Sequence, residues 1–230
     1  MGVGLLHAER AVISGNPFIG IYVRCTEKAA IVPVNAPEKL LLKCRSALKV
    51  DTVPMAIAGS DLAGLFSAAN SNGIVLTGMA YREEANALKK ALGINSAILR
   101  GKHTAAGNNI LANDKAAIVN PEMPPADVKK IADTLGVEVL KQSIAGFQTV
   151  GSVAVVTNRG ILLHNGAAED ELEELCDIFG VKGSIGTANM GVPFVGLCMC
   201  ANSKGYVTGE ATSGFELSRL DEAFGFVNAD

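Results

Sequence analysis

Gly151-Ser-Val-Ala-Val-Val156-Thr-Asn-Arg-Gly160-Ile-Leu-Leu163 is the fourth of five copies of one pattern in this chain of 230 residues. A leading glycine marks each copy, at intervals of 43 to 45 residues: Gly20, Gly64, Gly107, Gly151 and Gly196. A period of this size is typical of repeat architectures, in which one unit cannot bury its apolar face alone. Five units of about 44 residues fill residues 1–230, which we expect to form a single domain.

Each unit reads as a strand, a β-hairpin and a helix. In the fourth unit, residues 137–144 are rich in β-branched side chains and predict the first strand. Residues 151–156 are almost wholly apolar, as expected of a strand buried on both faces. Residues 157–160 form a turn that contains asparagine and glycine, and residues 161–163 pair back as a short strand.

The helix of this unit is expected over residues 167–179. Its apolar side chains are spaced as one helical stripe, and acidic residues fill its first turn, where the helix dipole favours them. Gly180 should end the helix in the left-handed conformation, as should Gly93, Gly136 and Gly225 in other units. Lys49 stands at this position in the first unit.

The last unit has no strand after its helix, and the first segment of the chain has no helix before it. Residues 5–13 read as a strand, so the economical prediction is that this segment completes the sheet of the last unit. The five units would then close into a ring that leaves no bare sheet edge. The fold class is therefore α/β, with five pseudo-symmetric units in a closed ring.

Charge and composition indicate the class of binding partner and the cellular compartment that we expect. The formal net charge is −3 and no basic cluster is present, which favours a protein over nucleic acid as the main partner. No run of 18 apolar residues and no signal peptide is found, so we expect no contact with a membrane. Five irregularly spaced cysteines fit reduced thiols in the cytoplasm.

Particular segments resemble the translation initiation factor 6 family, which has the pentein, or β/α-propeller, fold. The similarity covers nearly the whole chain, and the segments that carry it are 106–109 (AGNN), 136–142 (GVEVLKQ), 150–152 (VGS), 187–191 (TANMG) and 212–217 (TSGFEL). The chain stops soon after its fifth helix, whereas eukaryotic members carry an extra tail, so it is similar to the archaeal type.

This resemblance implies a non-catalytic ribosome factor without a cofactor. Members bind the large ribosomal subunit on the side that meets the small subunit, and so block the joining of the two sterically. The contact would be a ribosomal protein near the sarcin–ricin loop, with at most minor contact to ribosomal RNA. We expect a cytoplasmic monomer that acts in translation initiation and in biogenesis of the large subunit.

The family's contact face lies around the repeated glycines. Gly107 and Asn108 match its motif and are the first candidates for ribosome binding, and Val153 and Phe194 are further candidates on the same rim. Leu65 stands where eukaryotic members present an arginine, and would serve an apolar interface core. The alternative for Gly107 is that the backbone of the repeat requires a glycine there. The alternative for Phe194 is that its side chain belongs to the core.

The sequence leaves three alternatives open: an enzyme, a zinc-binding protein and a general adaptor. Some penteins are enzymes that modify guanidino groups with a cysteine nucleophile and a histidine base, and Cys198, Cys200 and His164 supply these residue types. Both cysteines fall in the predicted strand after Gly196, where other units have core residues, which favours a packing role. Cys198-x-Cys200 lacks the second ligand pair of a zinc site. A general adaptor protein would differ from a ribosome factor only in its partner.

Overall fold

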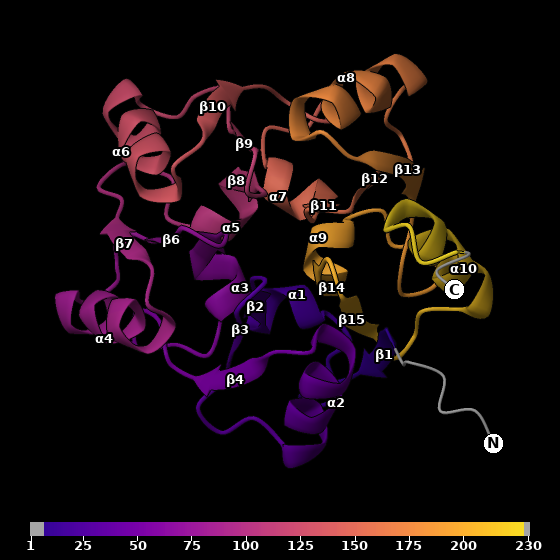
Figure 1. Cartoon of the computed structure of the whole chain (residues 1–230), viewed down its shortest axis with the longest axis horizontal. Helices are drawn as coiled ribbons and strands as arrows, with labels where there is room; N and C mark the ends of the chain where they lie inside the picture. The colour runs from indigo at the N-terminus through magenta and orange to yellow at the C-terminus, as the bar shows by residue number, and fades with distance from the viewer. Residues whose placement is uncertain (1–6, 228–230) are drawn as a thin grey trace.

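Five three-stranded sheets surround a common centre (Figure 1). The computed structural model describes residues 7–227. In each sheet, an antiparallel hairpin is extended by a third strand that runs parallel to the middle strand. In order of pairing, the sheets are β2 (Arg24–Cys25), β3 (Ala29–Val32), β4 (Asp51–Pro54); β5 (Ser67–Ala69), β6 (Gly73–Leu76), β7 (Asn95–Ile98); β8 (Ile110–Ala112), β9 (Ala116–Val119), β10 (Glu138–Lys141); β11 (Ala154–Val156), β12 (Gly160–His164), β13 (Lys182–Gly186); and β14 (Met199–Asn202), β15 (Gly205–Gly209), β1 (Ala8–Ala11).

Helices form an outer and an inner ring (Figure 1). The outer ring has five long helices: α2 (Glu38–Leu48), α4 (Arg82–Leu92), α6 (Pro125–Leu135), α8 (Glu169–Phe179) and α10 (Gly214–Ala223). The inner ring has five helical turns of four residues each: α1 (Ile19–Tyr22), α3 (Ala63–Phe66), α5 (Ala106–Asn109), α7 (Val150–Val153) and α9 (Val195–Cys198). Each inner turn packs against the next, and α9 packs against α1.

The leading glycines explain why the inner turns can pack so closely. A Cβ atom placed on Gly64 would collide with the carbonyl oxygen of Gly20, and one on Gly107 would collide with that of Gly64. The same relationship continues around the ring and ends with Gly20 against Gly196, the leading glycine of the last unit. Only a residue without a side chain fits at these five points, which accounts for the invariance of the repeat.

The predicted closing strand is confirmed for the part of it that the structure describes. Strand β1 pairs in parallel with β15, with Ala8 opposite Tyr206 and Ala11 opposite Gly209. Leu5 and Leu6, which were included in the prediction, lie outside the described residues. The first and last segments of the chain thus share one sheet, and the ring closes as expected.

One element of the predicted unit is wrong in part. Residues 151–156 were expected to be a strand throughout, but the first three belong to the helical turn α7, and only Ala154–Val156 form strand β11. Cys198 likewise ends the turn α9 instead of lying in a strand. A short apolar run cannot distinguish a strand from a helical turn, and here packing against the neighbouring glycine turn favours the helix.

The helix ends follow the prediction closely. Helix α8 begins at Glu169, two residues after the expected start, and ends at Phe179. Gly180 then adopts a left-handed conformation with a φ of 64°. Lys49 also takes this conformation, with a φ of 52°, so the repeat keeps its geometry where the glycine is missing. Pro125 occupies the first turn of α6, as its missing N–H allows.

Asparagine side chains join neighbouring units at the hairpin turns. Asn70 Nδ2 donates to the carbonyl oxygens of Asn113 at 3.0 Å and Leu135 at 2.9 Å. Asn113 repeats this arrangement on the following unit, and Asn202 makes it across the closure, to Thr26 and Leu48. Each bond satisfies a buried carbonyl that would otherwise lose its contact with water.

The sheets and outer helices enclose five clusters of buried apolar side chains around the ring. Within residues 7–227, none of the helices combines the length and apolar character needed to cross a membrane.

Candidate functional site

The ring has two unlike faces, and the strand directions define them. In the fourth unit Ala154, which directly follows the turn α7, pairs with Leu163 at the end of β12. The inner turns therefore lie on the same side as the loops that lead into the long helices. We call this side the glycine face. The opposite side, which carries the hairpin turns and the C-terminal ends of the long helices, is called the hairpin face.

Five of the eight large apolar side chains that are exposed in residues 7–227 lie in loops or first helical turns of the glycine face. Met190, in the loop before α9, is 79% exposed, and Phe215, in the first turn of α10, is 74% exposed. Tyr81, just before α4, is 60% exposed, and Val34 and Met79 lie exposed in equivalent loops. Apolar and aromatic side chains that are exposed to solvent in this way are typical of surfaces that bind another macromolecule.

The hairpin face is polar, and its side chains bind one another. Ser71 donates to Asp114 from its main-chain N–H at 2.7 Å and from its hydroxyl at 2.6 Å. Asp114 also accepts a bond from Asn158 at 2.6 Å. Ser203 makes the matching pair of bonds to Glu27 across the closure. These polar groups already form hydrogen bonds with one another. Fewer of them are therefore free to bind a partner than the polarity of the hairpin face suggests.

Tight loops on the glycine face are fixed by glutamates of the long helices. Glu84 of α4 accepts bonds from the main-chain N–H groups of Ala58 and Gly59 at 2.8 and 3.0 Å. Glu216 of α10 does the same for Met190 and Gly191, at 3.1 and 2.8 Å. Non-glycine residues in these loops adopt a positive φ, for example 61° at Met190. Fixed loops lose little entropy on binding, which favours a contact surface.

The pKa of Glu216 reflects the strength of the hydrogen bonds that this carboxylate accepts. Burial opposes ionisation of this carboxyl, yet hydrogen bonds from the main chain of Ser213 and Gly191, together with those from the Thr187 and Ser213 hydroxyls, outweigh it and lower the pKa of Glu216. The group is therefore a carboxylate at neutral pH. A charged acceptor makes stronger hydrogen bonds than a neutral one, and so holds the Met190 loop in place.

Leu65 and Asn108 are the sequence-predicted candidates that the structure leaves accessible. Each directly follows a leading glycine, in α3 and α5, and each is half-buried. Among the described residues, the Asn108 side chain makes no hydrogen bond. Its amide is therefore free to bond with a partner.

The other three candidates are less accessible. Gly107 is buried and belongs to the ring of close glycine contacts, so its role in the fold is a packing requirement. Val153 is fully buried in the core of the fourth unit and offers no side-chain surface. Phe194 is half-buried and packs against that core.

Phe194 belongs to an aromatic cluster that the sequence did not reveal. Its ring centroid lies 5.2 Å from that of Phe147 and 5.7 Å from that of His164, both in edge-on arrangements. Burial lowers the pKa of His164, and its Nδ1 accepts a bond from the Gly166 N–H at 2.8 Å, so the imidazole is neutral at pH 7. The Ile144–Phe147 loop and the turn α9 are thereby joined at the glycine face.

The Cys198 and Cys176 thiols lack the properties of a catalytic nucleophile. Burial raises the pKa of the Cys198 thiol to about 12, and burial also raises that of Cys176. Catalytic cysteines instead have lowered pKa values and partial exposure. In the described part of the chain, no group of three or more histidine, cysteine, aspartate or glutamate side chains is placed to hold a metal ion.

Comparison with known proteins decides the family, because the model of the eIF-6 family matches residues 8–223. The chain belongs to the eIF-6 family. It is 41% identical over 227 residues to translation initiation factor 6 of Pyrococcus horikoshii, which covers 96% of this chain and all of that relative. The protein of the same name from Methanosarcina mazei is 41% identical over 209 residues, covering 91% of this chain and 94% of the relative. That of Haloquadratum walsbyi is 36% identical, covering 96% and 97%.

Proposed function

We propose that this member of the eIF-6 family acts in translation initiation by binding the large ribosomal subunit through its glycine face. While it is bound there, its volume excludes the small subunit and prevents premature joining. The same contact would serve during biogenesis of the large subunit. The observation that carries the proposal is that most of the exposed large apolar side chains of the described residues lie on the glycine face, with Met190 in a loop that Glu216 fixes.

The charge of the chain supports a protein rather than RNA as the main contact, and the family resemblance implies a ribosomal protein close to the sarcin–ricin loop. A net charge of −3 gives no general attraction to the phosphates of ribosomal RNA, so contact with RNA is minor. Exposed aromatic and methionine side chains are enriched in protein–protein interfaces. Phe215 directly precedes Glu216 in α10, and Glu216 accepts a bond from the Met190 N–H; Phe215 and Met190 are the apolar anchors we expect at such an interface.

Asn108 and Leu65 complete the proposed contact from the inner turns, and Phe194 contributes the exposed part of its ring. Gly107 acts indirectly, because it lets α5 approach α3 and so places Asn108. Val153 stabilises the fourth unit from inside and makes no direct contact. The protein would act as a single-domain monomer in the cytoplasm, without a cofactor.

The alternative of a guanidino-modifying enzyme has less support. The buried Cys198 thiol is protonated at neutral pH, and His164, the base it would need, is engaged in the aromatic cluster. A nucleophile of this kind requires a thiolate and a base within reach of it. The relatives compared above are named as initiation factors, which fits a protein without catalytic activity.

Matched charge substitutions on the two faces test the proposal. Asn108→Arg places a charge at the glycine face, and Asn72→Arg makes the same change at an exposed position of the hairpin face. Binding to purified large subunits would be measured by co-sedimentation, with circular dichroism to confirm folding. We expect Asn108→Arg to weaken binding at least tenfold, about 1.4 kcal/mol, and Asn72→Arg to change it less than twofold. Equal affinity of both variants and the parent protein would overturn the assignment of the face.

A further inference from the structure

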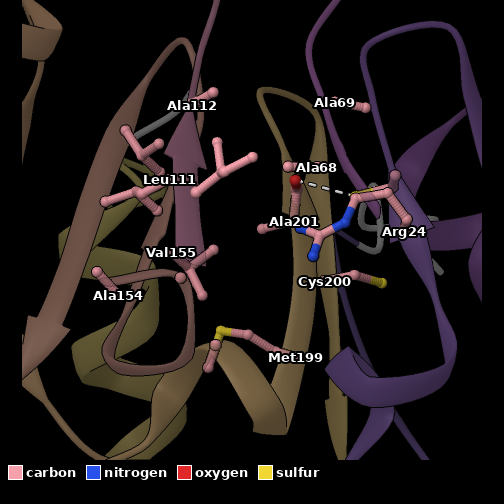
Figure 2. Close-up of a pocket in the computed structure, with 15 residues that line it drawn as sticks. Arg24, Ala68, Ala69, Leu111, Ala112, Ala154, Val155, Met199, Cys200 and Ala201 are labelled. Carbon is pink, nitrogen blue, oxygen red and sulfur yellow. Dashed lines mark hydrogen bonds between the residues drawn. The ribbon is translucent and has the colours of Figure 1, made fainter. Parts of the chain in front are cut away.

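A single arginine points into the cavity on the axis of the ring. Arg24 stands four residues after its leading glycine, where the other units have Ala68, Leu111, Val155 and Cys200. Figure 2 shows its guanidinium reaching into the space between Leu111 and Val155 on one side and Cys200 and Ala201 on the other. The position of this charge has no counterpart elsewhere in the repeat.

The guanidinium lacks most of its possible partners. Arg24 Nη2 donates to the carbonyl oxygen of Gly64. Its Nε is buried and has no hydrogen-bond acceptor. Among residues 7–227, no carboxylate lies within ion-pair distance of the Arg24 side chain. A guanidinium has five N–H donors, so this one retains several for a ligand.

No neighbouring group in the cavity balances the charge. The nearest charge-capable side chains are the thiols of Cys25 and Cys200. A hydrogen bond with Cys25, together with burial, raises the pKa of Cys200, so this thiol is neutral at pH 7. Burial lowers the pKa of Arg24, but an arginine stays protonated in proteins. Arg24 as a whole is half-buried, but its Nε is cut off from water, and a desolvated donor of a cation without a partner is unfavourable.

The volume of the cavity limits the size of the ligand that it can hold. Its volume is about 50 Å³, whereas one water needs about 10–15 Å³ on the same measure. A halide with one or two waters fits this volume, and a nucleotide does not. A second cavity of about 30 Å³ continues along the axis to the hairpin turns and shares Cys25, Ala69, Ala112 and Ala201 with the first. The carboxylates of Glu27 and Asp114 line this second cavity and disfavour an anion there, so the position beside Arg24 in the first cavity is the favoured one.

We propose that the axial cavity binds one small monovalent anion, chloride in the first instance, as the counter-ion of Arg24. The anion accepts the bond that Nε has free, and it lies against the walls that the third, fourth and fifth units supply. The site lies inside the ring, so it does not depend on the ribosomal function of the glycine face.

The dependence of the free energy of unfolding on chloride concentration tests the site. The full chain is unfolded with urea at constant ionic strength while potassium gluconate is replaced by potassium chloride. A ligand bound only by the folded state lowers the unfolding equilibrium constant by the factor 1 + [L]/Kd, about tenfold at ten times the dissociation constant. We expect this saturable effect in the parent protein and its loss in Arg24→Met. Arg82→Met, the same change on the exposed start of α4, should retain it.

Two measurements on the unaltered protein keep the proposal testable if Arg24→Met does not fold. A crystal grown in bromide should show one anomalous peak in contact with the Arg24 guanidinium. In solution, the protein should broaden the ³⁵Cl resonance, and bromide should reverse the broadening. A cavity with water alone in the bromide crystal, or stability that responds equally in Arg24→Met and the parent, would overturn the proposal.

Discussion

His7 Nε2 lies 2.9 Å from Asp221 Oδ1, although the two residues are 214 positions apart in the chain. The same carboxylate oxygen accepts a bond from the Tyr206 hydroxyl at 2.8 Å, and the His7 ring stacks on Phe226 with centroids 4.6 Å apart. The start of the chain is thus attached to the last strand and the last helix by side chains as well as by the β1–β15 pairing. Among residues 7–227, His7–Asp221 is the one histidine–carboxylate pair within ion-pair distance, and it lies at the closure.

We expect His7→Ala to loosen the closure. The substitution removes one hydrogen bond and one ring contact, and should lower the free energy of unfolding by about 1–2 kcal/mol in urea denaturation. His103→Ala, on a loop of the third unit, is the control and should change it by less than about 0.5 kcal/mol. An equal loss in both variants would show that the closure is not especially dependent on His7.

Gly107→Ala should damage the inner ring. The added Cβ collides with the carbonyl oxygen of Gly64, and a main-chain group between two packed turns cannot move aside. We expect a loss of about 3 kcal/mol or more, or failure to fold, seen as a drop in Tm. Gly214→Ala is the matched control, because a Cβ there meets no other atom within 4 Å. A stable Gly107→Ala protein would contradict the close packing of the inner turns.

Leu135→Ala in α6 should leave a cavity. Leu135 is fully buried, so the loss of burial and the cavity together should cost about 2–5 kcal/mol in urea denaturation. Leu42→Ala provides the comparison, since Leu42 of α2 is exposed and its truncation should have little effect. A loss below about 1 kcal/mol for Leu135→Ala would place that side chain outside the core.

The stabilisation by Glu216 should disappear in acid. Its pKa is lowered in the folded state, so its contribution is fully present above the pKa of the unfolded chain, about 4.3, and is lost as the pH falls through the folded value. Glu216→Gln should therefore cost about 1–3 kcal/mol at pH 7. The difference from the parent protein should shrink progressively below about pH 4.

Urea denaturation at several pH values measures this difference. Glu169→Gln, at an exposed position in the first turn of α8, is the control and should show little cost at any pH. A cost for Glu216→Gln that stays constant down to pH 3 would mean that the ionised form is not what holds the Met190 loop.

The sequence predicted the units and their closure because these depend on short-range patterns. Gly180 and Pro125 mark helix ends by their own backbone preferences, and the stripe of α8 needs only helical spacing. The inner turns were missed, since the run after Gly151 is apolar in either conformation. In the structure these turns pack with each leading glycine close to a main-chain carbonyl of the neighbouring unit, about 44 residues away, which no short-range pattern reveals.

The candidate site was predicted less well, for a related reason. Asn108, which matches the family motif, and Leu65, which departs from it at a contact position, are both accessible. Phe215 is not among the predicted site residues, although it lies off the stripe formed by Leu217 and Leu220, which is a usable signal for an exposed position. The aromatic cluster around Phe194 joins different units and has no short-range pattern.

Subunit joining is the most direct test of the proposed function. Purified large and small ribosomal subunits would be mixed at a magnesium concentration that promotes joining, and sucrose gradients run with increasing amounts of the protein. We predict that joined ribosomes fall in proportion to the protein, which migrates with the free large subunit, and that Asn108→Arg requires at least tenfold more protein for the same effect. Undiminished joining at saturating protein, or migration with joined ribosomes, would contradict the account.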